Sequence, residues 1–122
     1  MSYPNNMAFK SIVVAKDASL SPVLSLNPSE RLIGFITPAA IEATTARLTF
    51  KAGKTATGTF YAVYQDGTLL AQTFAVDEYN LFVAPAQLYG VRHIKIQTET
   101  AGGVAVAQAT AARTFYAIVE VY

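Results

Sequence analysis

Apolar residues occur along this chain in short runs, and turn-forming residues separate the runs. The segments 46–52 and 91–98 alternate between apolar and polar residues, which is the period of a β-strand with one buried face. Leu48 and Phe50 mark the apolar side of the first segment. Its polar side consists of Arg47, Thr49 and Lys51. The pattern therefore predicts strands that each turn one side to a core.

Other runs rich in β-branched and aromatic residues predict further strands, at 9–15, 23–26, 31–37, 59–65, 69–76, 81–83 and 113–122. The dipeptide Asp66-Gly67 favours a two-residue turn, so it predicts a hairpin and a meander of 46–52, 59–65 and 69–76. Short helical turns are expected at 38–43, with Thr37 as the cap, and at 85–90. Residues 101–112 are expected to form a loop with a short strand at 104–108.

These elements predict an all-β fold, an antiparallel β-sandwich or barrel with at most one or two short helical turns. We expect an N-terminal arm at residues 1–8 and a single domain at residues 9–122, because 122 residues suffice for one core.

Two strands have apolar residues on both faces, namely 59–65 and 113–122. Composition makes this notable, since 52% of the residues are hydrophobic and only 14% are charged, against about 25% charged in an ordinary soluble domain. Either loops cover the outer faces, or a neighbouring subunit does. The second interpretation predicts Tyr61, Val63, Tyr116, Ile118 and Tyr122 as contact residues, with Tyr3 and Phe9 in an arm (residues 2–9) that acts as a clasp.

Charge and leader segments exclude several function classes. Nine basic and eight acidic residues are scattered, which argues against a nucleic-acid-binding surface. The N-terminus lacks the pattern of a signal peptide, and no apolar run approaches the length of a membrane-spanning helix, so we expect synthesis in a cytoplasm and no membrane partner. The chain has no cysteine, so disulfides and thiolate metal sites are absent.

No catalytic motif is evident, so we expect a protein without enzymatic activity and without a cofactor. His93, the single histidine, shares the polar side of its strand with Lys95, and a catalytic role needs a nucleophile or an orienting carboxylate nearby. Asp77 and Glu78, with Asn80 close by, offer oxygen ligands for calcium, but they lack EF-hand spacing and indicate a solvated loop. No metal site is expected.

A series of short motifs follows one another in a familiar order. They are SLSP at 19–22, ITPAAI at 36–41, ARLTF at 46–50, FYAVY at 60–64, GVRHIKI at 90–96, QA at 108–109 and RTF at 113–115. In this order the chain resembles, from about Ser19 onward, a family of small structural proteins of tailed bacteriophages that is often found among head genes.

The middle of the chain also resembles a galactose-binding-type jelly roll, through LTF at 48–50 and RHIKI at 92–96. This resemblance implies a jelly-roll-like sandwich. The chain departs from that pattern in two places. Ile41 stands where a Trp is often found, and GKTA at 53–56 replaces a Ser-x-Asp-Gly turn.

These resemblances imply a virion protein that decorates or cements the phage capsid, and a homo-oligomer, expected to be a trimer, that also contacts capsid or other virion proteins. The alternative is a carbohydrate-binding or host-attachment module on the head or the tail. Its expected ligand loop contains Tyr79, Asn80, Tyr89 and Arg92.

Overall fold

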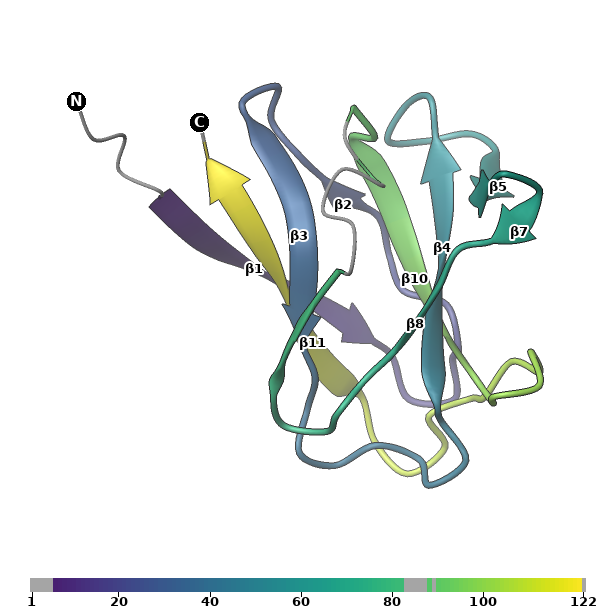
Figure 1. Cartoon of the computed structure of the whole chain (residues 1–122). Coiled ribbons are helices and arrows are strands. Elements are labelled where there is room, and N and C mark those ends of the chain that lie inside the picture. Colours follow the sequence, from purple (N-terminus) through teal and green to yellow (C-terminus); the bar gives the residue numbers. More distant parts are fainter. Residues whose placement is uncertain (1–5, 83–87, 89, 122) are drawn as a thin grey trace.

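The computed structural model describes residues 6–82, 88 and 90–121, and these form two antiparallel sheets packed face to face (Figure 1). The strands are β1 (Asn6–Val14), β2 (Leu24–Ser25), β3 (Glu30–Ile36), β4 (Arg47–Gly53), β5 (Phe60–Ala62), β6 (Tyr64–Gln65), β7 (Thr68–Leu69), β8 (Ala71–Thr73), β9 (Tyr79–Leu81), β10 (His93–Glu99) and β11 (Arg113–Val121). The predicted β-sandwich is confirmed. The described residues contain no α-helix, and Leu88 alone among them has 3-10 conformation.

The strand order is that of a jelly roll. Sheet A has the order β1-β11-β3-β9, and sheet B has the order β2-β10-β4-β5, with β8 also paired to β4. If β5 and β8 are counted as one interrupted strand, the described residues form eight main strands, and all but one of the connections between them cross from one sheet to the other. This is the double Greek key that defines the jelly roll.

The inner faces of the two sheets form the core. Phe35 of sheet A stacks on Phe50 of sheet B with ring centroids 5.9 Å apart, and Phe82 meets both rings edge-on. The alternation at 46–52 and 91–98 is explained by this arrangement, because Leu48, Phe50, Ile94 and Ile96 all point inward and are fully buried. Thr49, expected on the solvent side, is buried because it donates a hydrogen bond to Glu99, 2.8 Å between oxygens.

The Asp66-Gly67 hairpin is confirmed, but the meander around it is not. Both turn residues have positive φ, 50° and 76°, as a tight hairpin turn requires. The strands beside the turn, β6 and β7, leave sheet B and form a separate two-stranded ribbon. As a result, β5 and β8 lie end to end along the same edge of β4 instead of side by side.

Of two local predictions at the opposite end of the sandwich, one is wrong and the other is confirmed only in part. Thr37 does not cap a helix, since its hydroxyl donates to the carbonyl of Ala75 at 2.6 Å, and residues 38–43 form bends and a turn. Residues 104–108 form a single antiparallel bridge, between Ala105 and Glu99, but no extended strand. Beyond the bridge, Gln108 is fully buried, accepts a hydrogen bond from the amide of Glu42 and donates to Thr45 and Thr98. Side-chain hydrogen bonds therefore continue the contact that the bridge begins.

The ends of two predicted segments differ from expectation or fall outside the described residues. β1 begins at Asn6 and pairs with β11 from that residue onward, so residues 6–8 belong to sheet A and not to a separate arm. The rest of the expected arm, at residues 1–5, lies outside the described residues. So do residues 85–87 and 89 of the second predicted helical turn.

Candidate functional site

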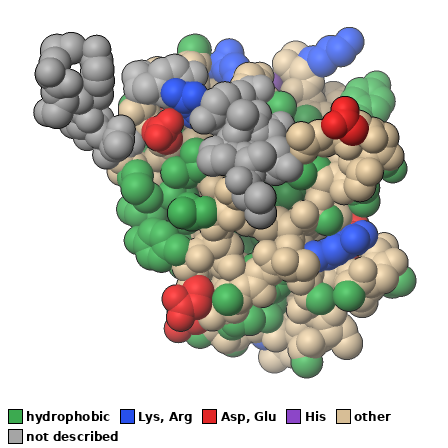
Figure 2. Space-filling view, viewed as in Figure 1, with side chains coloured by type: hydrophobic (Ala, Val, Ile, Leu, Met, Phe, Trp, Pro, Cys, Tyr) green, Lys and Arg blue, Asp and Glu red, His purple; other side chains and the backbone are tan. Residues whose placement is uncertain are grey.

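The outer face of sheet A is mostly apolar. Ten large hydrophobic side chains are exposed among the described residues, and six of them lie on this face. The six are Met7, Phe9, Val13, Tyr79, Leu81 and Tyr116, and together they are called the apolar face below. Figure 2 shows hydrophobic side chains gathered at the left of the view, where Figure 1 places sheet A. Exposed apolar patches of this kind mark sites of interaction.

An aromatic pair spans the centre of the apolar face. Phe9 on β1 and Tyr79 on β9 meet edge-to-face, with ring centroids 6.2 Å apart, although β11 and β3 lie between their strands. Between them along the sheet are Ile118 and Gly34, which are direct neighbours on β11 and β3. The two rings lean over this pair, which explains why Ile118 points outward yet has no exposed surface.

An ion pair lies at the upper end of sheet A. Arg31 on β3 and Glu120 on β11 are cross-strand neighbours joined at 3.2 Å, and Glu120 also lies opposite Met7. This ion pair gives the apolar, aromatic centre a polar boundary at one end, and polar boundaries are usual in protein–protein interfaces.

The predicted contact residues divide between the two sheets. Phe9 and Tyr116 lie on the apolar face, 47% and 45% exposed, with Ile118 buried beneath it. Tyr61 lies on the edge of sheet B and is 62% exposed, while Val63 is half-buried and packs against the core. Tyr3 and Tyr122 fall outside the described residues.

Sequence reasoning missed half of the apolar face. Met7, Val13 and Leu81 were not singled out, and Tyr79 was assigned to a ligand loop. A signal existed in β1, where odd and even positions both carry apolar residues (Met7, Phe9 and Val13 against Ala8, Ile12 and Val14).

A second candidate site is an open depression of about 350 Å³ beside the upper end of sheet B. It is called the basic depression below and is lined by Ala52, Gly53, Lys54, Tyr61, Gly90, Val91, Arg92 and His93. β4 and β5 provide one side, and the start of β10 with the residues before it provides the other.

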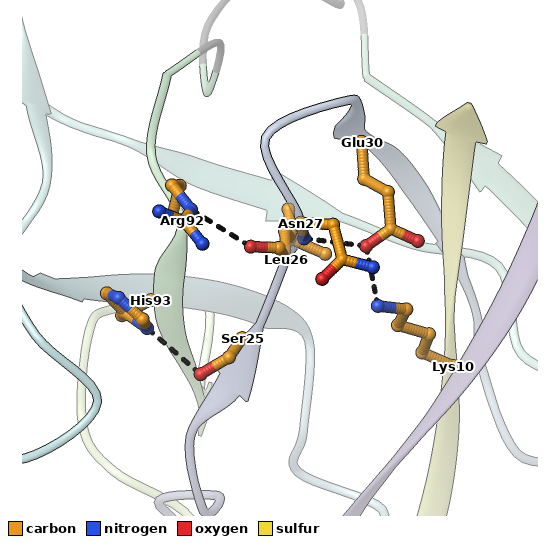
Figure 3. A network of polar contacts seen from close by, with 7 residues as sticks. All are labelled: Lys10, Ser25, Leu26, Asn27, Glu30, Arg92 and His93. Carbon is orange, nitrogen blue, oxygen red and sulfur yellow. Dashed lines mark hydrogen bonds and ion pairs between the residues drawn. The ribbon is translucent and has the colours of Figure 1, made fainter. Parts of the chain in front are cut away.

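Hydrogen bonds to the β2 segment hold two residues of the basic depression in place (Figure 3). Arg92 donates through Nε to the carbonyl oxygen of Leu26 at 3.1 Å, and its own carbonyl accepts from the Leu26 amide at 2.8 Å. His93 Nδ1 lies 2.9 Å from the Ser25 hydroxyl. One nitrogen of each side chain, Nε of Arg92 and Nδ1 of His93, is therefore held by the β2 segment.

The one carboxylate drawn in Figure 3, that of Glu30, already has hydrogen-bond partners. Glu30 accepts from Lys10 Nζ at 2.6 Å and from the Asn27 amide at 2.7 Å. The Lys10 hydrogen bond, followed by the Asn27 amide, lowers the pKa of Glu30 below its ordinary value, so the carboxylate stays charged and paired.

The alternative ligand loop is not brought together. Tyr79 packs against Phe9 on sheet A. The Asn80 side chain is occupied with the turn before it, accepting from the Ala75 amide at 2.7 Å and donating to the Glu78 carbonyl at 2.9 Å. Arg92 lines the basic depression instead, and Tyr89 lies outside the described residues.

Two groups in the described part of the chain, the Ser25–His93 pair and Glu99, carry side chains of a kind used in catalysis. The Ser25–His93 pair places a hydroxyl beside the histidine, but no described carboxylate bonds to that imidazole to orient it. Glu99 is buried and held by Arg47 at 3.0 Å. No group of three or more metal-ligating side chains occurs among the residues described, Asp77 and Glu78 included. Within the same residues, no helix is long and apolar enough to cross a membrane.

Comparison of the chain with protein-family models, with curated proteins and with solved structures gave no match.

Proposed function

We propose that this protein is a non-enzymatic structural protein of a tailed-bacteriophage virion. It decorates or cements the head through contacts with copies of itself, three being the expected number, and with capsid proteins. The observation that carries the proposal is the apolar face of sheet A. The motif order described above supplies the virion context.

The composition of the apolar face supports a protein partner. Its exposed residues are two tyrosines, a phenylalanine, a methionine, a leucine and a valine, and aromatic residues and methionine are enriched in protein interfaces. The charged residues beside them, Arg31 and Glu120, are paired with each other. A sheet face that served only to meet water would carry mainly polar residues.

A cement function follows from this surface without any chemistry. Burying apolar surface stabilises a contact by about 25 cal/mol per Å², and a contact repeated over a lattice adds its stabilisation at every copy. The jelly roll suits such a role, being common in viral capsid domains, but it is equally common in lectins. The fold alone therefore does not decide between the two hypotheses.

The test is the mass of the protein in solution, measured by light scattering, together with co-sedimentation with heads of the phage that encodes it. We expect an oligomer for the unaltered chain. Tyr116→Glu places a charge at the centre of the apolar face and should weaken self-association or head binding at least about tenfold.

The matched control is Tyr64→Glu, which makes the same change at a tyrosine of the β6–β7 ribbon that is 62% exposed. It should leave association unchanged. A protein that remains monomeric at high concentration and does not sediment with heads contradicts the proposal, and so does an equal loss for both variants.

A further inference from the structure

The basic depression carries positive charge that no described carboxylate neutralises. Lys54 and Arg92 line it. Lys51 on β4 and Lys95 on β10 lie directly opposite each other on the outer face of sheet B, two residues along from Gly53 and His93. They add positive charge near the depression but do not line it. The three ion pairs recorded in the described part of the chain use other cations, namely Lys10, Arg31 and Arg47.

This arrangement costs stability unless something offsets it. Like charges that face each other across two strands destabilise a sheet. Lys95 gains some compensation from the ring of Phe60, whose centroid is 4.5 Å from Nζ. Lys51, Lys54 and Arg92 have no such compensation recorded. An anion supplied from outside the chain would neutralise the cluster.

The groups that would receive an anion are held ready. The backbone and Nε of Arg92 are fixed to Leu26, which leaves its two terminal nitrogens directed away from that bond (Figure 3). His93 is fixed through Nδ1 by Ser25, which leaves Nε2 available. Because these side chains are already ordered, less conformational entropy is lost when a ligand binds.

The remainder of the lining fits a ring better than a bare ion. Tyr61, Val91 and Ala52 offer apolar surface, and at Gly90 no neighbouring atom lies where a side chain would begin. A volume of about 350 Å³ lies at the lower end of the range for small-molecule sites, about 300–1,000 Å³. A single substituted sugar ring suits that size.

We propose that the basic depression binds an acidic sugar. The ring packs on Tyr61, and its carboxylate or phosphate lies between Arg92 and Lys54. This site is on a different sheet from the apolar face, so it goes beyond the structural role proposed above, and either proposal can fail without the other.

The single histidine of the chain makes a clean test possible, because its ring signals in an NMR spectrum belong to one residue. The full chain is titrated with glucuronic acid, with glucose 6-phosphate and with glucose. We expect saturable shifts of the His93 ring signals with one or both acids, at concentrations at least about tenfold lower than with glucose. The two acids distinguish a carboxylate ligand from a phosphate ligand.

Three variants localise the binding. Arg92→Gln should weaken it about tenfold or more, and Tyr61→Ala should weaken it as well without a cost in folding, because Tyr61 is exposed. Lys16→Gln removes the same charge from an exposed site in the β1–β2 loop and should change binding by less than about twofold.

Several outcomes overturn the proposal. Equal shifts with glucose and the two acids would remove the role of the anion. An unchanged affinity in Tyr61→Ala would mean that no sugar ring is recognised. A loss in Lys16→Gln as large as in Arg92→Gln would reduce the effect to diffuse charge, and the absence of any saturable shift would exclude the site.

Discussion

Gly34 lies in the middle of sheet A, between Ile118 on β11 and Leu81 on β9. A β-bulge lies next to it, because the pairing of β11 with β3 shifts register between Ile118 and Val119. A Cβ atom built on Gly34 would overlap the carbonyl oxygen of Asn80 and lie 2.9 Å from the Cα of Leu81. The absence of a side chain therefore permits β9 to pair, and β9 supplies Tyr79 and Leu81 to the apolar face.

Gly34→Ala should consequently destabilise the protein by about 2 kcal/mol or more, because the obstructing atoms are backbone and cannot rotate away. Urea denaturation followed by circular dichroism measures the change. Gly102→Ala is the control, since its Cβ would meet nothing nearer than 3.9 Å, and it should stay within about 0.5 kcal/mol of the unaltered chain. Equal stability of both variants would show that β9 does not depend on this close approach.

At the scale of elements, the β6–β7 ribbon is an insertion within an edge strand. Ala62 pairs with Lys51 and Ala71 with Thr49, so only one residue is needed opposite Phe50 to make the edge continuous. By register, Val63 from one side and Leu70 from the other both fall at that position. They are joined at the base of the ribbon by a 2.9 Å hydrogen bond from the Leu70 amide to the Val63 carbonyl.

Deleting residues 63–69, which leaves Leu70 opposite Phe50, should therefore join β5 and β8 into one strand and preserve the sandwich. We expect a cooperative unfolding transition and unchanged self-association, because the apolar face lies on the other sheet. The measurements are thermal denaturation and light scattering. A deletion variant that fails to fold, while the Tyr64→Glu control folds normally, would show that the ribbon is needed for the edge.

Local patterns predicted the strands well and their partners poorly. The alternation around Leu48 and Ile94 and the positive-φ turn at Asp66-Gly67 depend on neighbouring residues, so the sequence reveals them. Pairing between β1 and β11 joins residues about a hundred or more positions apart, and no local pattern encodes it. For this reason the apolar face, built from β1, β9 and β11, was only partly foreseen, and Tyr61 was grouped with residues of the other sheet.

At the scale of the whole molecule, the two outer faces differ in kind. The outer face of sheet A exposes apolar residues, whereas that of sheet B carries Lys51, Lys95 and the half-buried His93. The two faces also differ in charge pairing, since Arg31 and Glu120 of sheet A pair with each other, whereas Lys51 and Lys95 of sheet B are like charges directly opposite each other. The sequence predicted an interface on the strands at 59–65 and 113–122. Of these, only the second, β11, lies in sheet A with the apolar face.

Salt should separate the two faces experimentally. Raising the ionic strength from about 0.1 M to about 1 M shortens the Debye length from about 10 Å to about 3 Å. Binding of an acidic sugar at the basic depression should weaken markedly, while association through the apolar face should hold or strengthen. Paired NMR titrations and light-scattering runs at both salt concentrations measure this. Association that collapses in high salt would mean that charges, and not the apolar face, hold the oligomer together.

The position of β11 has a consequence for synthesis. This strand comes last in the described chain, yet it lies between β1 and β3 in the middle of sheet A. While the ribosome is still making residues 113–121, β1 has no partner strand, and Phe9 and Tyr79 have no sheet to hold them together. The apolar face therefore comes into existence only when translation has passed Val121. A nascent chain cannot display it early, because the face exists only after β11 has been synthesised and has paired with β1 and β3.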